Sequence, residues 1–198
     1  MKEIVVATTN KGKIAEIALV LAKLPVKILA LGDFGDIPEA VENGDSFAAN
    51  AKIKAEHYAF YTKKACLADD SGLEVDALGG APGIYSARYA GEDADDAMNN
   101  QKLLAELAGV PSNKRSARFR CVLAFADIDG TIITVDGSKE GVIGQEMRGA
   151  EGFGYDPLFF MPEMGKTMAE CSKVEKNKIS HRGEALKGMA SRLGEYLK

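Results

Sequence analysis

The sequence predicts an α/β protein in which a long mixed β-sheet is flanked by helices. The first observation is a βαβ-like beginning, where two β-branched runs, residues 4–7 and 26–31, enclose apolar residues at helical spacing. The second is a middle section, residues 115–147, in which apolar and polar residues first alternate and a continuous apolar run and a hairpin turn then follow. Parallel pairing in the first part and antiparallel pairing in the second make the sheet mixed, and helices then cover its faces.

Composition limits the class of protein. The chain has 198 residues, 46% hydrophobic and 27% charged, which is typical of one globular domain or two small lobes sharing a core. No apolar run approaches the ~20 residues that span a bilayer, and the first apolar segment is too short for a signal peptide. The three cysteines lack metal-ligand spacing, so we expect reduced thiols in a cytoplasmic protein. A net charge of −4 argues against an extended nucleic-acid surface, so any nucleotide-related ligand is expected to be small.

The first strand-to-helix connection is a candidate anion site. The loop Thr8-Thr9-Asn10-Lys11-Gly12-Lys13 precedes a predicted helix over residues 14–21. A helix N-terminus offers backbone N–H groups and the positive end of the dipole, and the loop adds lysines. Its glycine spacing is not that of a Walker A loop, so hydroxyls, amides and Lys11 or Lys13 would hold a phosphate. The alternative is an ordinary turn with a Thr or Asn N-cap.

A second helix is predicted after an acidic loop, residues 32–44, that contains Glu42. Asp45 or Ser46 is its expected N-cap, and it ends near Thr62. Lys54 is the odd member of the apolar arc of this helix. Its side chain either snorkels along the surface or points into a phosphate pocket.

The stretch Ala65-Cys66-Leu67-Ala68-Asp69-Asp70-Ser71-Gly72 is an apolar run that ends on two adjacent carboxylates. We expect a buried strand that stops at a sheet edge, where α/β proteins place their sites. Adjacent carboxylates repel each other unless a metal, a basic partner or a retained proton compensates. Two interpretations therefore stay open, a metal site and a type I β-turn over Asp-Asp-Ser-Gly.

The middle of the chain supplies scaffold. Residues 79–89 form a glycine-rich segment that we expect to be an ordered loop. Asp93 is the expected N-cap of a helix that buries Leu103 and Leu107. The strands expected after this helix are residues 115–126, residues 131–135 beyond a turn at Asp129-Gly130, and residues 141–147.

Two segments near the C-terminus carry further candidates. Phe153 lies between two glycines, so its ring either stacks on a base or belongs to the core. Ser180 is the expected N-cap of the last helix, which places His181 and Arg182 in the first turn. Positive charge there opposes the helix dipole, and an anion or polar ligand would compensate for it. The alternative is two exposed side chains of no consequence.

Five motifs in this order resemble those of the inosine triphosphate pyrophosphatases, enzymes that hydrolyse non-canonical purine nucleoside triphosphates. The motifs are residues 8–13, 69–73, 80–89, 152–157 and 180–183, and the resemblance extends from Val6 to about Leu186. It implies a single domain, residues 1–198, with two lobes and the active site in the cleft between them. It also implies a homodimer and Mg²⁺-dependent cleavage of ITP, dITP and XTP to the monophosphate and pyrophosphate.

The resemblance also assigns roles to individual residues. Asp70 matches the general base, which is also near the metal, and Glu42 matches a further metal carboxylate. The residues that match substrate-binding positions are Thr8, Thr9, Asn10, Lys11, Gly12, Lys13, Ser71, Phe153, Gly154, Tyr155, Asp156, Lys176, His181 and Arg182. The first six of these are expected to hold the triphosphate.

This assignment agrees with the chemistry of triphosphate hydrolysis, which requires charge neutralisation and an oriented water. Mg²⁺ held by Glu42 and Asp70 would neutralise phosphate charge, together with the lysines Lys11, Lys13 and Lys54. Asp70 would also accept the proton of the attacking water. The expected partner is a small-molecule nucleoside triphosphate, with no nucleic acid and no membrane. Two alternatives remain: another Mg²⁺-dependent nucleotide phosphatase that releases orthophosphate, and a non-catalytic nucleotide-binding module. The carboxylates argue against the module, because a pure binder gains little from negative charge beside a triphosphate.

Overall fold

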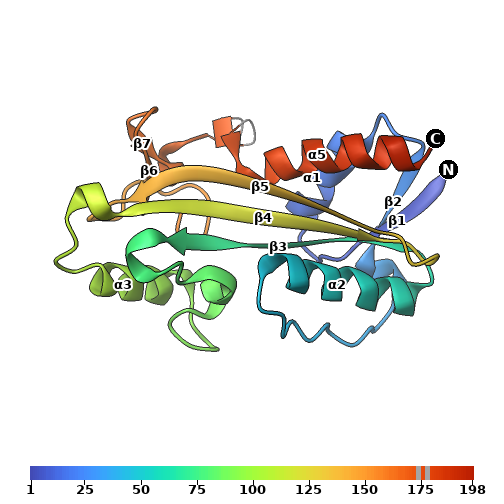
Figure 1. The fold of residues 1–198 in the computed structure, drawn as a ribbon, viewed down its shortest axis with the longest axis horizontal. Coiled ribbons are helices and arrows are strands. Elements are labelled where there is room, and N and C mark those ends of the chain that lie inside the picture. Colours follow the sequence, from blue (N-terminus) through green and yellow to red (C-terminus); the bar gives the residue numbers. More distant parts are fainter. Residues whose placement is uncertain (173–174, 177–178) are drawn as a thin grey trace. The chain divides into compact units, whose positions relative to one another are not determined.

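The computed structural model describes residues 1–172, 175–176 and 179–198. In this part of the chain seven strands form one sheet in the order β2-β1-β3-β4-β5-β6-β7 (Figure 1). β1 pairs in parallel with β2 and β3, whereas β6 pairs antiparallel with β5 and β7. The sheet is therefore mixed, which confirms the predicted fold class.

The bounds of the elements agree with most of the expected ranges. The strands are β1 (Lys2–Val6), β2 (Val26–Ala30), β3 (Ala65–Val75), β4 (Ser116–Ala126), β5 (Ile132–Ile143), β6 (Phe159–Met161) and β7 (Lys166–Thr167). The α-helices are α1 (Lys11–Leu21), α2 (Phe47–Thr62), α3 (Asp96–Glu106) and α5 (His181–Tyr196). Short 3₁₀ helices are η1 (Leu31–Phe34), η2 (Asp76–Leu78), η3 (Gly83–Arg88), η4 (Ser112–Lys114) and η5 (Met168–Glu170). None of the helices in the described ranges has both the length and the hydropathy needed to cross a bilayer.

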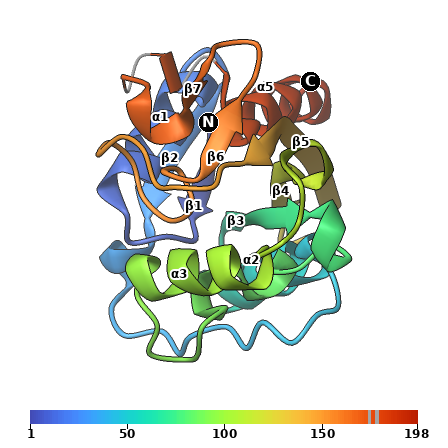
Figure 2. The same ribbon diagram turned by 90° about the vertical axis from the view of Figure 1, so that its left-hand side faces the viewer.

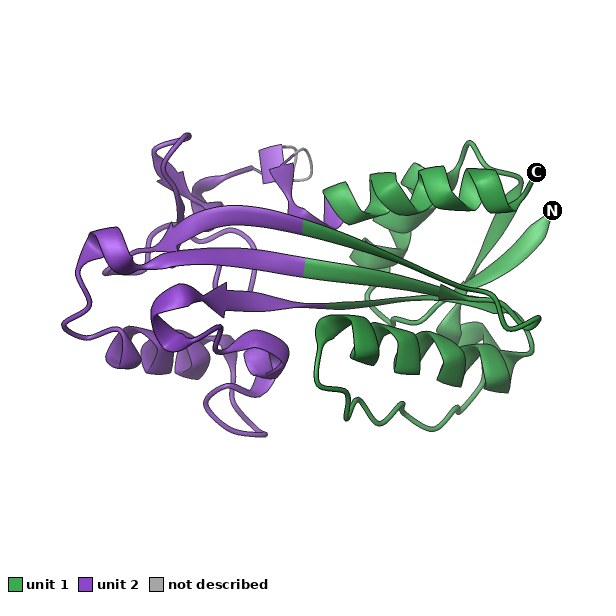
Figure 3. Cartoon of the chain, in the orientation of Figure 1, with its two compact units in different colours: residues 1–70, 121–137, 184–198 green, residues 71–120, 138–183 purple. Residues whose placement is uncertain are grey.

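The chain divides into two compact units (Figure 3). Unit 1 comprises Met1–Asp70, Cys121–Gly137 and Glu184–Lys198, and unit 2 comprises Ser71–Arg120 and Ser138–Gly183. The strands β3, β4 and β5 each contribute residues to both units. The active-site cleft that the family resemblance implies stays a prediction.

Unit 1 has helices on both faces of its strands. Figures 1 and 2 show α1 and α5 on one face and α2 on the other. Ile4 and Val6 of β1 pack into the cluster formed with Leu21 of α1 and Met189 of α5. Val5 points to the opposite face and is equally buried, because α2 covers that face. This double burial explains why β1 is apolar throughout rather than alternating.

Unit 2 is built around α3 and the second halves of the long strands. Leu103 and Leu107 of α3 are fully buried, as predicted, in a cluster with Leu73 of β3 and Phe159 of β6. Phe119 of β4 joins this cluster, with its ring centroid 4.5 Å from that of Phe159. The apolar face of α3 therefore fixes this helix against the strands of unit 2.

The turn interpretation of Asp69-Asp70-Ser71-Gly72 is wrong, and so is the expectation that the strand stops there, because β3 continues to Val75. Leu73 and Val75 are completely buried, and their burial together with the strand pairing outweighs the turn preference of the local sequence. The two aspartates therefore lie inside a strand rather than at its end. The register pairs Val6 with Leu67, so Asp69 and Asp70 extend beyond the last pairing with β1.

Two further boundaries differ from expectation. Asp95 rather than Asp93 is the N-cap of α3, since its Oδ1 accepts a hydrogen bond from the backbone N–H of Met98 at 2.8 Å. The local sequence does not distinguish the two acids, and only the position of the first helical turn selects one of them. The strands expected at residues 131–135 and 141–147 are one strand, β5, since pairing with its neighbours continues across the residues between them.

Candidate functional site

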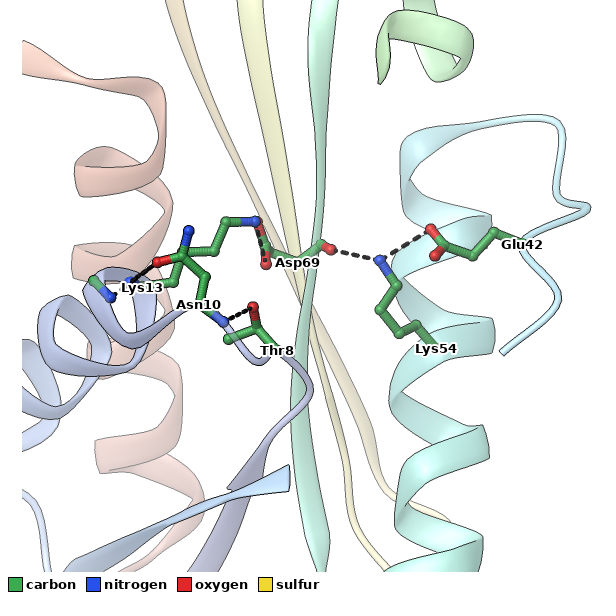
Figure 4. Close-up of polar contacts among 7 residues, drawn as sticks. Thr8, Asn10, Lys13, Glu42, Lys54 and Asp69 are labelled. Carbon is green, nitrogen blue, oxygen red and sulfur yellow. Dashed lines mark hydrogen bonds and ion pairs between the residues drawn. The ribbon is translucent and has the colours of Figure 1, made fainter. Parts of the chain in front are cut away.

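The N-terminus of α1 is ordered by its own side chains. Asn10 is the N-cap, and its Oδ1 accepts hydrogen bonds from the backbone N–H groups of Gly12 at 2.9 Å and Lys13 at 3.1 Å. Thr8 Oγ1 in turn accepts one from the Asn10 N–H at 3.2 Å (Figure 4). The Asn-cap interpretation is therefore correct. The cap occupies the N–H groups of Gly12 and Lys13, so an anion at this loop would be held by the hydroxyl and lysine side chains rather than by these two amides.

Lys13 reaches from α1 to the first aspartate of β3. Its Nζ lies 3.2 Å from Oδ1 and 2.9 Å from Oδ2 of Asp69. Asp69 is 8% exposed, so water screens this ion pair less than it screens a surface pair. The acid pair of β3 thus has the basic partner that its charge requires.

Lys54 approaches the same strand from α2. Its Nζ donates to the backbone carbonyl oxygen of Asp69 at 3.1 Å and lies 2.9 Å from Oε2 of Glu42. Only 18% of the Lys54 side chain is exposed. The snorkelling interpretation is therefore wrong, and the ammonium group lies beside a carboxylate predicted to bind metal.

The direction of the Asp70 side chain follows from the alternation of side chains along β3. Figure 4 shows Lys13 and Lys54 approaching Asp69 from opposite sides, with the carboxylate turned toward α1. Successive side chains of a strand point to opposite faces, so the carboxylate of Asp70 points to the face that α2 covers. We therefore expect the Asp70 carboxylate on the same face as Glu42, which forms an ion pair with the Lys54 ammonium.

These residues fit a hard divalent cation. Carboxylate oxygens are the protein ligands that Mg²⁺ prefers, and one or two of them suffice when phosphates and water complete the shell. Within the described ranges, no group of three or more His, Cys, Asp or Glu residues forms a metal cluster. Glu42 and Asp70 can thus provide an open site, in which the protein supplies two carboxylate ligands and substrate phosphates and water supply the others.

A second set of predicted residues lies in unit 2, around Asp156. Its Oδ2 accepts a hydrogen bond from the Phe153 N–H at 3.0 Å and pairs with Nζ of Lys176. The same Nζ lies 4.7 Å from the centroid of the Phe153 ring, a cation–π contact. Phe153 is 62% exposed, so the core interpretation is wrong and the ring is presented to solvent.

Gly152 is required by this arrangement. A Cβ atom at this position would lie 2.0 Å from Oδ2 of Asp156 and 3.1 Å from Nζ of Lys176. Its φ of +85° is also one that side chains rarely adopt. The glycine before Phe153 therefore makes room for the Asp156–Lys176 pair.

Tyr155, which was expected to contact substrate, has its side chain in the core of unit 2. It is 4% exposed, and its hydroxyl donates to the backbone oxygen of Ser86 at 2.8 Å. Burial raises the pKa of this phenol above its usual range. Its ring thus stabilises the segment that carries Phe153.

The start of α5 has the predicted cap. Ser180 Oγ accepts a hydrogen bond from the Gly183 N–H at 3.1 Å. The His181 ring stacks on Phe119, with centroids 5.1 Å apart and planes 19° from parallel. His181 and Arg182 are both half-buried, so they are not fully exposed, and their part in binding substrate stays a prediction.

The predicted residues thus form one set in each unit. Unit 1 holds Thr8, Thr9, Asn10, Lys11, Gly12, Lys13, Glu42, Lys54 and Asp70, and unit 2 holds Ser71, Phe153, Gly154, Tyr155, Asp156, Lys176, His181 and Arg182. The sequence assigned no role to Asp69, although its place beside Asp70 was a signal. It also missed Asp96 and Asn100 of α3, which bind the backbone of Gly154 and carry no motif.

Comparison with known proteins identifies relatives over nearly the whole chain. Residues 4–192 match the model of the Ham1 family. A dITP/XTP pyrophosphatase of Desulforamulus reducens is 54% identical over 185 residues, which cover 93% of this chain and 92% of that protein. One of Geobacillus kaustophilus is 54% identical over 186 residues, 94% and 91% of the two chains. Among solved structures, a HAM1 protein from Coxiella burnetii superposes with a TM-score of 0.93 at 44% identity, covering 98% of this chain and 100% of that one.

Proposed function

Because this chain belongs to the Ham1 family, we propose that it is a pyrophosphatase that hydrolyses ITP, dITP and XTP to the nucleoside monophosphate and pyrophosphate. One observation carries the proposal: two lysines from different helices lie beside the acid pair of β3, Lys13 through its ion pair with the Asp69 carboxylate and Lys54 through the Asp69 backbone oxygen and Glu42. Several cations next to carboxylates that can hold a metal or accept a proton are what triphosphate hydrolysis requires.

The residues of unit 1 are suited to the triphosphate. Lys13 is already held near β3 by Asp69, so a bound phosphate gains a cation whose position is set in advance. The loop of residues 8–13 adds hydroxyl groups and a second lysine, Lys11. These groups bind phosphate oxygens whatever the base is.

Glu42 and Asp70 would hold Mg²⁺. When bound there, the ion neutralises phosphate charge and makes the attacking water more acidic. Asp70 would accept a proton from a water whose oxygen attacks the α-phosphorus, and as this bond forms the bond from the α-phosphorus to the bridging oxygen breaks and pyrophosphate leaves. Lys54, bound to Glu42, keeps that carboxylate oriented toward β3.

The residues of unit 2 are suited to the purine. The exposed ring of Phe153 offers a face for stacking, worth about 1–3 kcal/mol per base. Arg182 offers donors to the 6-oxo group, an acceptor that adenine lacks. Each part of the nucleotide thus has side chains of matching chemistry.

We also propose that the protein acts as a homodimer in the cytoplasm on a small-molecule substrate, without nucleic acid or membrane. Cys66, Cys121 and Cys171 are buried and form no disulfide, in keeping with a reducing compartment. Sedimentation at working concentration tests the dimer.

The deciding experiment measures pyrophosphate and orthophosphate separately from ITP, XTP, GTP and ATP with Mg²⁺. We expect pyrophosphate from ITP and XTP. Asp70→Asn is expected to keep the fold and nucleotide binding but lose about 10²–10⁴-fold in kcat, the usual contribution of a general base. Orthophosphate as the product would favour the phosphatase alternative, and binding without turnover in the wild type would favour the binding module.

A matched pair of variants tests the metal carboxylate. Glu42→Gln should raise the Mg²⁺ concentration needed for half-maximal rate, because one anionic ligand is lost. Glu39→Gln changes an exposed acid in the same loop and should leave that concentration unchanged. Equal responses of the two variants would remove Glu42 from the metal site.

A further inference from the structure

Helix α3 binds both polar groups of a single residue in the segment that carries Phe153. Oδ2 of Asp96 accepts a hydrogen bond from the Gly154 N–H at 2.6 Å. Nδ2 of Asn100 donates to the Gly154 carbonyl oxygen at 2.8 Å. All three residues belong to unit 2.

The orientation of the Asn100 amide is determined by its partners. Besides Gly154, its Nδ2 donates to the carbonyl oxygen of Asp96 at 2.7 Å. Both partners are acceptors, so the NH₂ group and not the oxygen must face them. Asn100 is 2% exposed, so its two Nδ2 hydrogen bonds offset part of the cost of burying an amide whose Oδ1 has no hydrogen-bond partner among the described residues.

Asp96 and Asn100 are one helical turn apart and therefore lie on the same side of α3. The N–H that Asp96 binds belongs to the peptide between Phe153 and Gly154, and the carbonyl that Asn100 binds belongs to the next peptide. Two consecutive peptide planes are thus held by one rigid helix. This contact compensates for the conformational freedom of Gly154, whose φ is +60°.

The ring of Phe153 needs such support. It is 62% exposed, so core packing does not hold it in place. Its position follows from its backbone and from the Lys176 contact on one face. The backbone is in turn held at Phe153 by the hydrogen bond to Asp156 and at Gly154 by the hydrogen bonds of Asp96 and Asn100.

The neighbouring asparagine attaches α3 to a second segment. Asn99 Oδ1 accepts from the Ala90 N–H at 2.8 Å, and its Nδ2 donates to the Ala87 oxygen at 3.0 Å. Tyr155 joins this segment to the Phe153 segment through its bond to Ser86. The glycine-rich motif at residues 80–89 thus braces the Phe153 segment.

From these contacts we propose that Asp96 and Asn100 are positioning residues for base recognition, which act through Gly154 to hold Phe153 where a purine stacks. This inference rests on the proposed function. It predicts that loss of either hydrogen bond weakens nucleotide binding through the base while the phosphate-binding residues of unit 1 are unaffected.

The test compares Asp96→Ala, Asp96→Asn and Asn100→Leu. Asp96→Ala and Asn100→Leu each remove one bond to Gly154 and should raise KM for ITP roughly tenfold, with kcat changed less than about threefold. Asp96→Asn loses the same charge but retains an acceptor for the Gly154 N–H, so KM should return to near the wild-type value. Inhibition by pyrophosphate should be the same in all three.

Asp95→Ala is the matched control. It removes the N-cap of the same helix without touching Gly154, so it should lower Tm and leave KM unchanged. An equal rise of KM in Asp95→Ala, an Asp96→Asn variant as impaired as Asp96→Ala, or unchanged KM in Asn100→Leu would each overturn the proposal.

Hydrogen exchange of the segment that contains Gly154 separates this inference from the proposed function. The Gly154 amide should exchange at least tenfold faster in Asp96→Ala than in the wild type or Asp95→Ala. A wild type that does not hydrolyse ITP refutes the proposed function and the base-positioning role with it. Unchanged exchange with normal turnover refutes only the positioning role.

Discussion

Gly152→Ala is the substitution whose cost the structure defines most directly. The added methyl group would lie 2.0 Å from Oδ2 of Asp156, well inside any real contact distance. The carboxylate must therefore move. When it does, it loses the hydrogen bond from the Phe153 N–H and the ion pair with Lys176.

The magnitude follows from the two parts of the change. Placing alanine in a left-handed conformation costs roughly 1–2 kcal/mol. Each charge-assisted hydrogen bond of the buried carboxylate is worth about 1.5–3 kcal/mol, of which renewed hydration restores a part. We expect the free energy of unfolding to fall by about 4 kcal/mol, a large share of the ~5–15 kcal/mol of a typical domain.

Gly130→Ala separates the backbone cost of a left-handed alanine from the loss of the Asp156 contacts. Gly130 has a similar φ of +91°, but a methyl group added there would meet no atom within 4 Å beyond its chain neighbours, so only the backbone cost applies. Urea unfolding should show a loss of about 1–2 kcal/mol for Gly130→Ala. Gly152→Ala should also raise KM for ITP, because the displaced Asp156 releases Lys176 from Phe153. Equal stability losses in the two variants would refute the steric argument.

Three further predictions follow from the two sets of residues. Lys13→Ala should weaken the binding of ITP, XTP and ATP alike, because the lost charge contacts phosphate and not the base. Phe153→Ala should cost about 1–3 kcal/mol in ITP binding and leave pyrophosphate binding unchanged. Normal ITP binding by Phe153→Ala would exclude stacking. Arg182→Ala should lower kcat/KM for ITP roughly tenfold more than for ATP, and an unchanged ratio would remove Arg182 from base recognition. Burial raises the pKa of Cys66 to about 12, so thiol titration at about pH 8 should find this thiol unreactive in the folded protein and reactive in urea. Rapid reaction of Cys66 without denaturant would contradict its burial.

Local patterns determined most elements of this protein. The predicted apolar run of β1, the helical spacing of α1 and α2 and the N-cap Ser180 are correct, because periodicity and caps depend on residues within a few positions of one another. For α2 the sequence left Asp45 and Ser46 open, and the structure selects Ser46. The exposure of Phe153 was left open by its flanking glycines and decided by the structure.

The tertiary structure decided which residues meet. β3 continues through Asp69 and Asp70 because burial and pairing along the strand outweigh a local turn preference. Lys13 binds an aspartate 56 positions away, and Asp96 binds a backbone group 58 positions away. Such contacts exist only once strands and helices have become neighbours, so no local spacing predicts them. The sequence by itself determined which chemical groups are present, and the packing of α1, α2 and α3 determined which of these groups hold one another in place.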